Sequence, residues 1–401
     1  MSLANGREYL AIPGPSVMPD RVLRAMHRAA PNIYEGDIVD EVAGISRDLK
    51  AVAKTRGELA IYIANGHGAW EAALANTHSR GETCLVLATG RFALGWSQHA
   101  AGLGLELDVM DFGKQSDVDL DALARHLAAD ADHRIKSVLV VQVDTATSVK
   151  NDIAGIRRVL DETGHPALLM VDCIASLACD RYEMDAWGVD VTVAGSQKGL
   201  MTPPGLSFVF FNDKAAAARE TANCVTTYWD WRPRSHPEHF YQYFGGTAPT
   251  HHLFALREAL AMIAEEGLEA IHTRHEVLAR AVWAAFDAWG AEGPLRMNIA
   301  DPAKRSTAVT ALSIGAPYGN EIRKWVEANA GVTLGLGIGM VDRANPDSHG
   351  FFRIAHMGHV NAHMVLGALG AIEAGLTAIG VPHGSGALEA AARVCAGSSS
   401  G

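Results

Sequence analysis

The stretch Val171–Phe208, VDCIASLACDRYEMDAWGVDVTVAGSQKGLMTPPGLSF, concentrates the informative features of this sequence. An apolar run, ALLMV, ends directly before Asp172, and a second apolar run, Val189–Val193, is followed by Lys198. Short apolar runs of this kind predict buried strands. Ligands of open α/β sheets bind beyond the carboxyl ends of the strands, so Asp172 and Lys198 are candidates for one shared site.

The same pattern extends outward on both sides of this stretch. Short apolar runs alternate with helical segments, which predicts an α/β fold with a mostly parallel sheet covered on both faces. The seven predicted strands are Leu59–Ile63, Thr83–Leu87, Leu105–Met110, Val138–Val143, Ala167–Val171, Val189–Val193 and Leu206–Phe211.

The chain length and the change of pattern after the last strand predict more than one domain. A chain of 401 residues is long for one domain, given a usual size of roughly 150 residues. The aromatic and Pro-rich segment Tyr228–Pro249 interrupts the alternation, and a long helical run follows that is broken near Gly267. We expect an N-terminal arm (1–18), a large domain (19–250), a linking helix (251–275), a small C-terminal α/β domain (276–392) and a flexible tail (393–401).

Composition narrows the range of partners. The net charge is −11 and no basic stretch is evident, which argues against a nucleic-acid partner. The five cysteines form no CxxC pair, so reduced thiols in a cytoplasmic protein are expected rather than disulfides or structural zinc. His356 and His359 have no third ligand at a suitable spacing, so no metal site is predicted. The apolar runs are too short to cross a membrane, and the N-terminus does not read as a signal peptide.

A glycine-containing loop, Asn65–Gly68, follows the first predicted strand and opens a helix. Free N–H groups and the positive end of the helix dipole make such a loop a natural phosphate site, although an ordinary strand-to-helix turn would look the same. The GxGxxG dinucleotide pattern fails here, which disfavours an NAD-dependent dehydrogenase. An anion cradle, Asp172 and Lys198 together supply what pyridoxal phosphate needs: a phosphate clamp, a partner for the pyridinium nitrogen and a Schiff-base lysine.

Taken singly, these residues have simpler explanations. Asp172 could cap a helix or form a structural salt bridge, and a lone lysine is usually solvated. For Lys198, the apolar sequence that follows it argues against an open surface position.

These motifs resemble the class V aminotransferases of fold type I, in the serine–glyoxylate and alanine–glyoxylate aminotransferase branch. The strongest matches are Val171–Phe208 and NGHGAWEAAL at Asn65–Leu74. The resemblance extends from PGPS at Pro13–Ser16 to RIAHMGH at Arg353–His359. It implies the fold type I architecture and a pyridoxal-phosphate cofactor.

The resemblance also implies a role for individual residues. Lys198 is the expected Schiff-base lysine and proton shuttle, and Asp172 the expected partner of the ring nitrogen. Arg353 is expected to bind the substrate carboxylate, with Gly14 and Tyr34 at the substrate side. The remaining cofactor contacts are expected from Asn65, Gly66, His67 and Gln197 at the phosphate, Phe92 and Ile174 on the two ring faces, Thr145 or Thr147 at the ring hydroxyl, and Thr247 from a neighbouring subunit.

Three places depart from the family pattern. One is the loop VDTATSV at Val143–Val149, the source of the expected ring-hydroxyl contact, which differs from the form common in the family. Phe244 stands where relatives often have a tyrosine that reaches the phosphate, although Tyr243 could supply that contact. Tyr34 and Glu35 match the family poorly, which leaves the identity of the substrates open.

The expected function is a pyridoxal-phosphate aminotransferase that moves an amino group from serine or alanine to glyoxylate or pyruvate by a ping-pong mechanism. The resemblance implies a homodimer with its active site at the subunit interface. Pyridoxamine–pyruvate or 2-aminoethylphosphonate–pyruvate transamination on the same fold remains an alternative. Cysteine desulfuration ranks lower because only Cys395 lies near the small domain, and a non-catalytic binding protein is the alternative of a different class.

Overall fold

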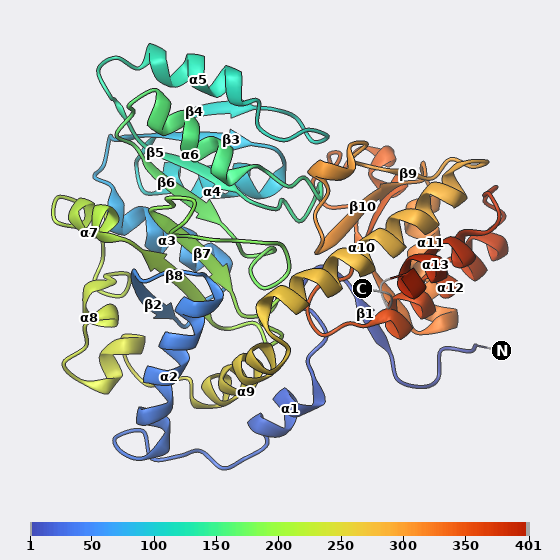
Figure 1. Ribbon diagram of the computed structural model, residues 1–401, viewed down its shortest axis with the longest axis horizontal. Helices are drawn as coiled ribbons and strands as arrows, with labels where there is room; N and C mark the ends of the chain where they lie inside the picture. Colours follow the sequence, from blue (N-terminus) through green and yellow to red (C-terminus); the bar gives the residue numbers. More distant parts are fainter. Residues whose placement is uncertain (1, 398–401) are drawn as a thin grey trace.

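The larger of two sheets forms the core of the larger part of the computed structural model, which describes residues 2–397 (Figure 1, left). Its strand order is β2-β8-β7-β6-β5-β3-β4. Strand β8 runs antiparallel to both of its neighbours and the other pairings are parallel, which confirms the predicted mostly parallel seven-stranded sheet. The strands are β2 (Glu58–Tyr62), β3 (Thr83–Ala88), β4 (Glu106–Asp111), β5 (Ile135–Val141), β6 (Leu168–Asp172), β7 (Val191–Gly195) and β8 (Ser207–Phe211).

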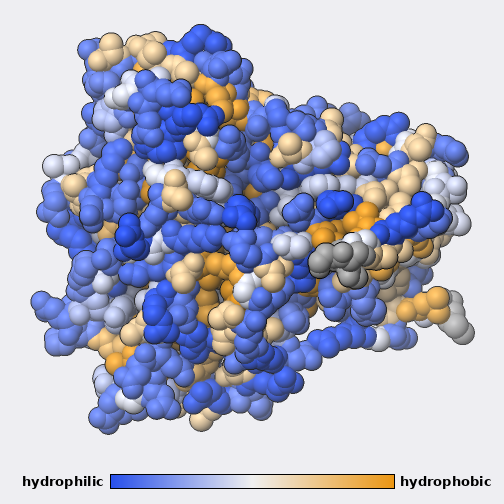
Figure 2. Space-filling model, in the orientation of Figure 1, coloured by the Kyte–Doolittle hydropathy of each residue, from blue (hydrophilic) through white to orange (hydrophobic). Residues whose placement is uncertain are grey.

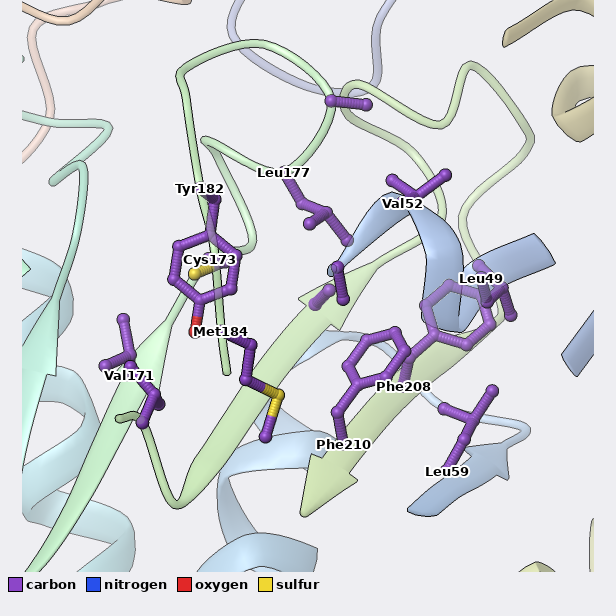
Figure 3. Close-up of a cluster of buried hydrophobic side chains, with 14 of the residues drawn as sticks. Leu49, Val52, Leu59, Val171, Cys173, Leu177, Tyr182, Met184, Phe208 and Phe210 are labelled. Carbon is purple, nitrogen blue, oxygen red and sulfur yellow. The ribbon is translucent and has the colours of Figure 1, made fainter. Parts of the chain in front are cut away.

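Helices cover both faces of this sheet, because alternate residues of each strand point to opposite sides. On β8, Phe208 and Phe210 join one buried cluster, and Val209 and Phe211 join the other. Figure 3 shows part of the first cluster, in which both phenylalanines lie near Leu49. The covering helices are α2 (Asp37–Val52), α5 (Leu120–Ala129), α6 (Ile153–Glu162) and α9 (Thr250–Glu266) on that face, and α3 (Gly66–Thr77), α4 (Arg91–Gly102) and α7 (Asp213–Arg219) on the other.

A second, five-stranded sheet forms the core of the smaller part, with the order β1-β11-β12-β10-β9. The N-terminal segment contributes β1, which pairs in parallel with β11 more than 300 residues later in the chain. The strands are β1 (Tyr9–Ala11), β9 (Arg296–Met297), β10 (Val309–Ser313), β11 (Val332–Leu336) and β12 (Phe351–Ala355), and the packed helices are α10 (Leu268–Gly290), α11 (Tyr318–Ala330), α12 (Ala362–Ala378) and α13 (Ala387–Gly397).

The long helical run between the two parts is broken where the sequence predicts it. Helix α9 ends at Glu266, and α10 begins at Leu268 and runs across to the smaller part (Figure 1). Gly267 between them has a φ of 83°, a left-handed conformation that glycine adopts without the strain of a side chain. The remaining short elements are α1 (Asp20–Met26), α8 (Arg232–Ser235), and the 3₁₀ turns at Phe240–Phe244, Pro302–Lys304 and Pro346–Gly350.

The prediction of a flexible tail from residue 393 is wrong for residues 393–397. Helix α13 continues to Gly397, because Val394 and Cys395 pack against the apolar core of the smaller part. Residues 398–401 lie outside the described part of the chain.

The visible face of the molecule is largely hydrophilic, with scattered apolar side chains (Figure 2). Within residues 2–397, no helix combines the length and the apolar character that a membrane span requires. The same residues contain no group of three or more His, Cys, Asp or Glu side chains that could hold a metal ion.

Candidate active site

The carboxyl ends of β2, β5, β6 and β7 and the loop after β3 enclose a cavity of about 180 Å³. Strand β2 points the same way as β7, since both run antiparallel to β8, so its carboxyl end meets the others at one edge. Nine of the eleven predicted cofactor residues line this cavity: Asn65, Gly66, His67, Phe92, Thr145, Asp172, Ile174, Gln197 and Lys198.

Asp172 is the last residue of β6, and its carboxyl is only 2% exposed. One oxygen accepts a hydrogen bond from the Trp70 indole Nε1 at 2.8 Å, and the other accepts from the Ile174 backbone N–H at 2.7 Å. Burial raises the pKa of Asp172 to about 7 in spite of these two donors. A buried carboxylate without a cationic partner is poised to hold a protonated nitrogen.

Lys198 follows β7 and is 8% exposed, so it is not the solvated lysine that its type alone would suggest. Its Nζ donates a hydrogen bond to the Pro13 carbonyl oxygen of the N-terminal segment. Desolvation, with a smaller contribution from the charge of Arg353, lowers the pKa of Lys198 to about 8. A substantial fraction of its amine is therefore neutral near physiological pH and able to act as a nucleophile or a base.

Gly14 lies beside Lys198 rather than in open space. A Cβ at position 14 would come within 2.7 Å of the Lys198 Cδ, and the backbone φ of +103° also favours glycine. Gly14 thus lies next to the expected Schiff-base lysine, and its place beside the substrate stays a prediction.

Helix α3 begins at the cavity, and its first turn contributes Gly66 and His67 to the lining. The Asn65 side chain caps the helix by accepting hydrogen bonds from the backbone N–H groups of His67 (3.1 Å) and Gly68 (3.4 Å). A Cβ at Gly66 would come within 3.2 Å of the Ile174 Cγ1, so glycine lets the helix start approach the ring-facing isoleucine. The His67 ring lies edge-on to Trp70, with centroids 4.6 Å apart.

Gln197 enters the cavity with a side-chain oxygen that is buried and has no hydrogen-bond partner among residues 2–397. Buried polar atoms are nearly always paired, so such an atom calls for an explanation. An amide in this position can turn its N–H₂ or its oxygen toward a polar ligand.

The two threonines proposed for the ring hydroxyl are placed differently. Thr145 lines the cavity. Thr147 lies outside its lining and donates its hydroxyl to the Thr89 carbonyl oxygen at 3.2 Å. The structure therefore brings Thr145, and not Thr147, to the site.

Arg353 stands on β12 of the smaller part, and the structure brings it to the edge of the site. Its Nε donates to the Leu336 carbonyl at 2.6 Å and its Nη1 to the Thr145 carbonyl at 2.7 Å. Within residues 2–397, its Nη2 donates no hydrogen bond and no carboxylate forms a salt bridge with the guanidinium. Desolvation lowers the pKa of Arg353 to about 10, so it still carries a full charge at neutral pH and can receive a carboxylate.

Four further residues named from the sequence lie away from the cavity in the single chain. Tyr34 is 86% exposed on the segment before α2, and its backbone N–H is bonded to the Asn32 side chain. Thr247 is also exposed. Phe244 is buried in the large apolar cluster and Tyr243 packs against it, so neither supplies a phosphate contact within this chain.

Sequence reasoning missed Trp70 and Pro13. A buried indole N–H needs an acceptor, so a tryptophan two residues after the Asn65–Gly68 loop was the available signal for Trp70. No comparable signal exists for Pro13, because its contribution is a backbone carbonyl brought in by the pairing of β1 with β11.

The residues present fit pyridoxal phosphate. The cavity combines an amine, a buried carboxyl, a helix start free of acidic side chains in its first turn and an amide with an unpaired buried oxygen. These groups match the aldehyde, the ring nitrogen and the phosphate of that cofactor.

Comparison with known proteins gives the same assignment. The family model of class-V aminotransferases matches residues 9–354. The chain is 36% identical to the serine–glyoxylate aminotransferase of Methylorubrum extorquens, over 94% of this chain and 92% of that protein, and 36% identical to that of Arabidopsis thaliana, with the same coverage. The crystal structure of pyridoxamine–pyruvate aminotransferase from Mesorhizobium loti superimposes with a TM-score of 0.86 at 23% identity, covering 99% of this chain and all of that one, which supports the fold. The chain belongs to the class-V aminotransferase family, whose members are pyridoxal-phosphate-dependent transaminases.

Proposed function

We propose that this transaminase moves an amino group from serine or alanine to glyoxylate or pyruvate. The observation on which the proposal rests is the meeting of Lys198, Asp172 and Arg353 around one edge of the sheet. The serine–glyoxylate aminotransferases of Methylorubrum extorquens and Arabidopsis thaliana support the choice of substrates.

Lys198 is proposed to form the covalent link to the cofactor and, once released, to move a proton from the substrate α-carbon. Its partly neutral amine favours both tasks, and the Pro13 carbonyl gives the released amine an acceptor. Bound pyridoxal phosphate supplies a ring that stabilises negative charge at the substrate α-carbon. Asp172 is proposed to keep the ring nitrogen protonated, with Trp70 and the Ile174 N–H fixing its two oxygens.

The other residues are proposed to orient the two ligands. All seven line the cavity: we assign the phosphate to Asn65, Gly66, His67 and Gln197, and the ring to Phe92, Ile174 and Thr145. Arg353 is assigned the substrate carboxylate, because two of its nitrogens are anchored on carbonyls and the third remains to receive an anion.

We also propose a homodimer in which Thr247 and Tyr34 reach the partner's site, since both are exposed and neither contacts the cavity of its own chain. Mixing inactive Lys198→Ala and Thr247→Trp subunits tests this arrangement. A mixed dimer contains one site with both residues intact, so activity should return on mixing. No return of activity after verified subunit exchange would refute it.

A cytoplasmic location is proposed from the buried thiols of Cys84, Cys173, Cys179 and Cys224.

A matrix of amino donors and oxo-acid acceptors tests the substrates. L-serine, L-alanine, L-aspartate, pyridoxamine and 2-aminoethylphosphonate are each paired with glyoxylate and with pyruvate, and kcat/KM is measured. The proposal predicts the highest values for serine or alanine. A preference of tenfold or more for pyridoxamine or the aminophosphonate would replace the proposed donors while keeping the class of reaction.

A further inference from the structure

Asp144 is a fully buried carboxyl three residues beyond the end of β5, and neither the predicted nor the proposed chemistry uses it. Three backbone N–H groups donate to it: Phe92 at 2.7 Å to one oxygen, and Ala146 at 2.9 Å and Thr147 at 3.2 Å to the other. Burial raises the pKa of Asp144, and these donors and the charge of Arg353 act in the opposite direction.

The first of these bonds serves as a helix cap supplied from another loop. Helix α4 begins at Arg91, and its N-cap residue, Gly90, has no side chain that could accept from the free N–H groups of the first turn. The Asp144 carboxylate accepts from Phe92 in its place. A Cβ at position 90 would lie within 2.6 Å of both carboxylate oxygens, so glycine at this position is what allows the approach.

The other two bonds close the turn that carries Thr145. Thr145 lines the cavity, and its carbonyl oxygen accepts a hydrogen bond from Arg353 Nη1. Asp144 therefore holds two residues that line the cavity, Phe92 directly and Thr145 through its turn. Through the Thr145 carbonyl it is also connected to Arg353, which we assign to the substrate carboxylate.

Charge adds a second link between these groups. Arg353 is buried and is anchored on neutral carbonyls, and Asp144 is the carboxylate whose field favours its charged form. The same charge opposes the ionisation of Asp172. The charge of Asp144 thus acts on both assigned groups of the proposed site: Asp172, for the ring nitrogen, and Arg353, for the substrate carboxylate.

From this geometry we infer that Asp144 is a positioning residue: it fixes Phe92 against the cofactor ring and, through the Thr145 turn, holds Arg353 in the orientation that receives the carboxylate of the amino donor. The inference rests on the proposed function, and it assigns to Asp144 no contact with the reacting atoms.

The test is Asp144→Asn, which keeps the shape but places an N–H₂ group opposite an N–H donor. Asp190→Asn is the matched control, because Asp190 is also buried, also accepts a backbone N–H (Leu169, 2.8 Å), and lies at the amino end of β7, away from the cavity. For Asp144→Asn we expect a 10- to 100-fold rise in KM for the amino donor and an equal weakening of inhibition by propionate. Charge-assisted hydrogen bonds of this kind commonly change a binding constant by about one to two powers of ten. The visible circular dichroism of the bound cofactor should change as well, because Phe92 would no longer be fixed.

A KM, a propionate inhibition constant and a dichroism spectrum that match those of the Asp190→Asn control would overturn the inference. If the Asp144 variant does not fold, Gly90→Ala provides the same test, because its Cβ displaces the carboxylate from the Phe92 N–H. Wild-type values in a folded Gly90→Ala protein would then overturn it. The proposed function is judged separately, on whether the wild-type protein binds the cofactor with a visible band and transaminates.

Discussion

The indole of Trp70 controls the proton affinity of Asp172, and replacing it by phenylalanine isolates this effect. Its Nε1 supplies one of the two hydrogen bonds that the buried carboxyl accepts, at 2.8 Å. A hydrogen bond to a charged group contributes about 1.5–3 kcal/mol, and one pKa unit corresponds to about 1.4 kcal/mol. Trp70→Phe should therefore raise the pKa of Asp172 by about one to two units above its value of about 7. Without this donor the ionised carboxyl that would pair with a protonated ring nitrogen is less stable, so affinity for pyridoxal phosphate should fall about 10- to 100-fold.

The assay is a binding titration of the cofactor-free protein with pyridoxal phosphate at several pH values. Trp96→Phe is the matched control: Trp96 is also fully buried, stacks on Trp70 with centroids 6.2 Å apart, and its Nε1 has no hydrogen-bond partner among residues 2–397. We expect a much larger loss for Trp70→Phe than for Trp96→Phe, with the difference narrowing as the pH rises and Asp172 ionises in both proteins. Equal losses in the two variants at all pH values would refute the reasoning.

Three further predictions concern other groups of the site. Arg353→Lys should raise KM for the amino donor about 10- to 100-fold, because one ammonium cannot replace a guanidinium anchored on two carbonyls. Arg323→Lys is the control: Arg323 also donates to a β11 carbonyl but does not line the site, so KM should stay unchanged. Lys198→Met should raise the melting temperature of the cofactor-free protein at neutral pH, because the buried ammonium destabilises the fold below its folded pKa of about 8. The increase in melting temperature should disappear as the pH rises from about 8 to 10.5, the pKa of an ordinary lysine. An increase that does not depend on pH would contradict this account. Gly66→Ala should weaken pyridoxal-phosphate binding without unfolding the protein, because the new Cβ displaces Ile174, and unchanged affinity in a binding titration would show that the cradle tolerates a side chain.

Most strands of the large sheet could be predicted from the sequence because they are short, largely apolar runs in a chain where helices separate the strands; the edge strand β4, ELDVMD, is the least apolar of them. The observed bounds differ from the predicted ones by one to three residues at most ends, as at β5, Ile135–Val141 against Val138–Val143. The rule that ligands bind at strand carboxyl ends then brought Asp172, Lys198 and the Asn65 loop together, and the cavity contains all three.

Contacts between distant segments could not be predicted in the same way. The pairing of β1 with β11 depends on the packing of the whole smaller part, and it delivers the Pro13 carbonyl to Lys198. The choice between Thr145 and Thr147 depends on the turn that Asp144 closes, because adjacent loop residues have no periodic pattern to show which of them faces a cavity. The pattern after residue 392 suggested a tail, whereas packing against α10 keeps Val394 in a helix.

Tyr34 and Thr247 differ from these cases, because both are exposed in the single chain and neither lines its cavity. Both assignments stay predictions, and the subunit-mixing experiment tests that of Thr247.

The most direct test of the proposed site is one half-reaction, measured without an acceptor. Purified protein loaded with pyridoxal phosphate is mixed with excess L-serine, then in a separate experiment with L-alanine, and the released 2-oxo acid is counted against the cofactor while the visible spectrum is recorded. The proposed site predicts one oxo acid per cofactor, loss of the visible band of the lysine-bound cofactor, and neither change in the Lys198→Ala variant. Release of oxo acid at the wild-type rate by Lys198→Ala, or a wild-type protein that takes up no cofactor, would contradict it.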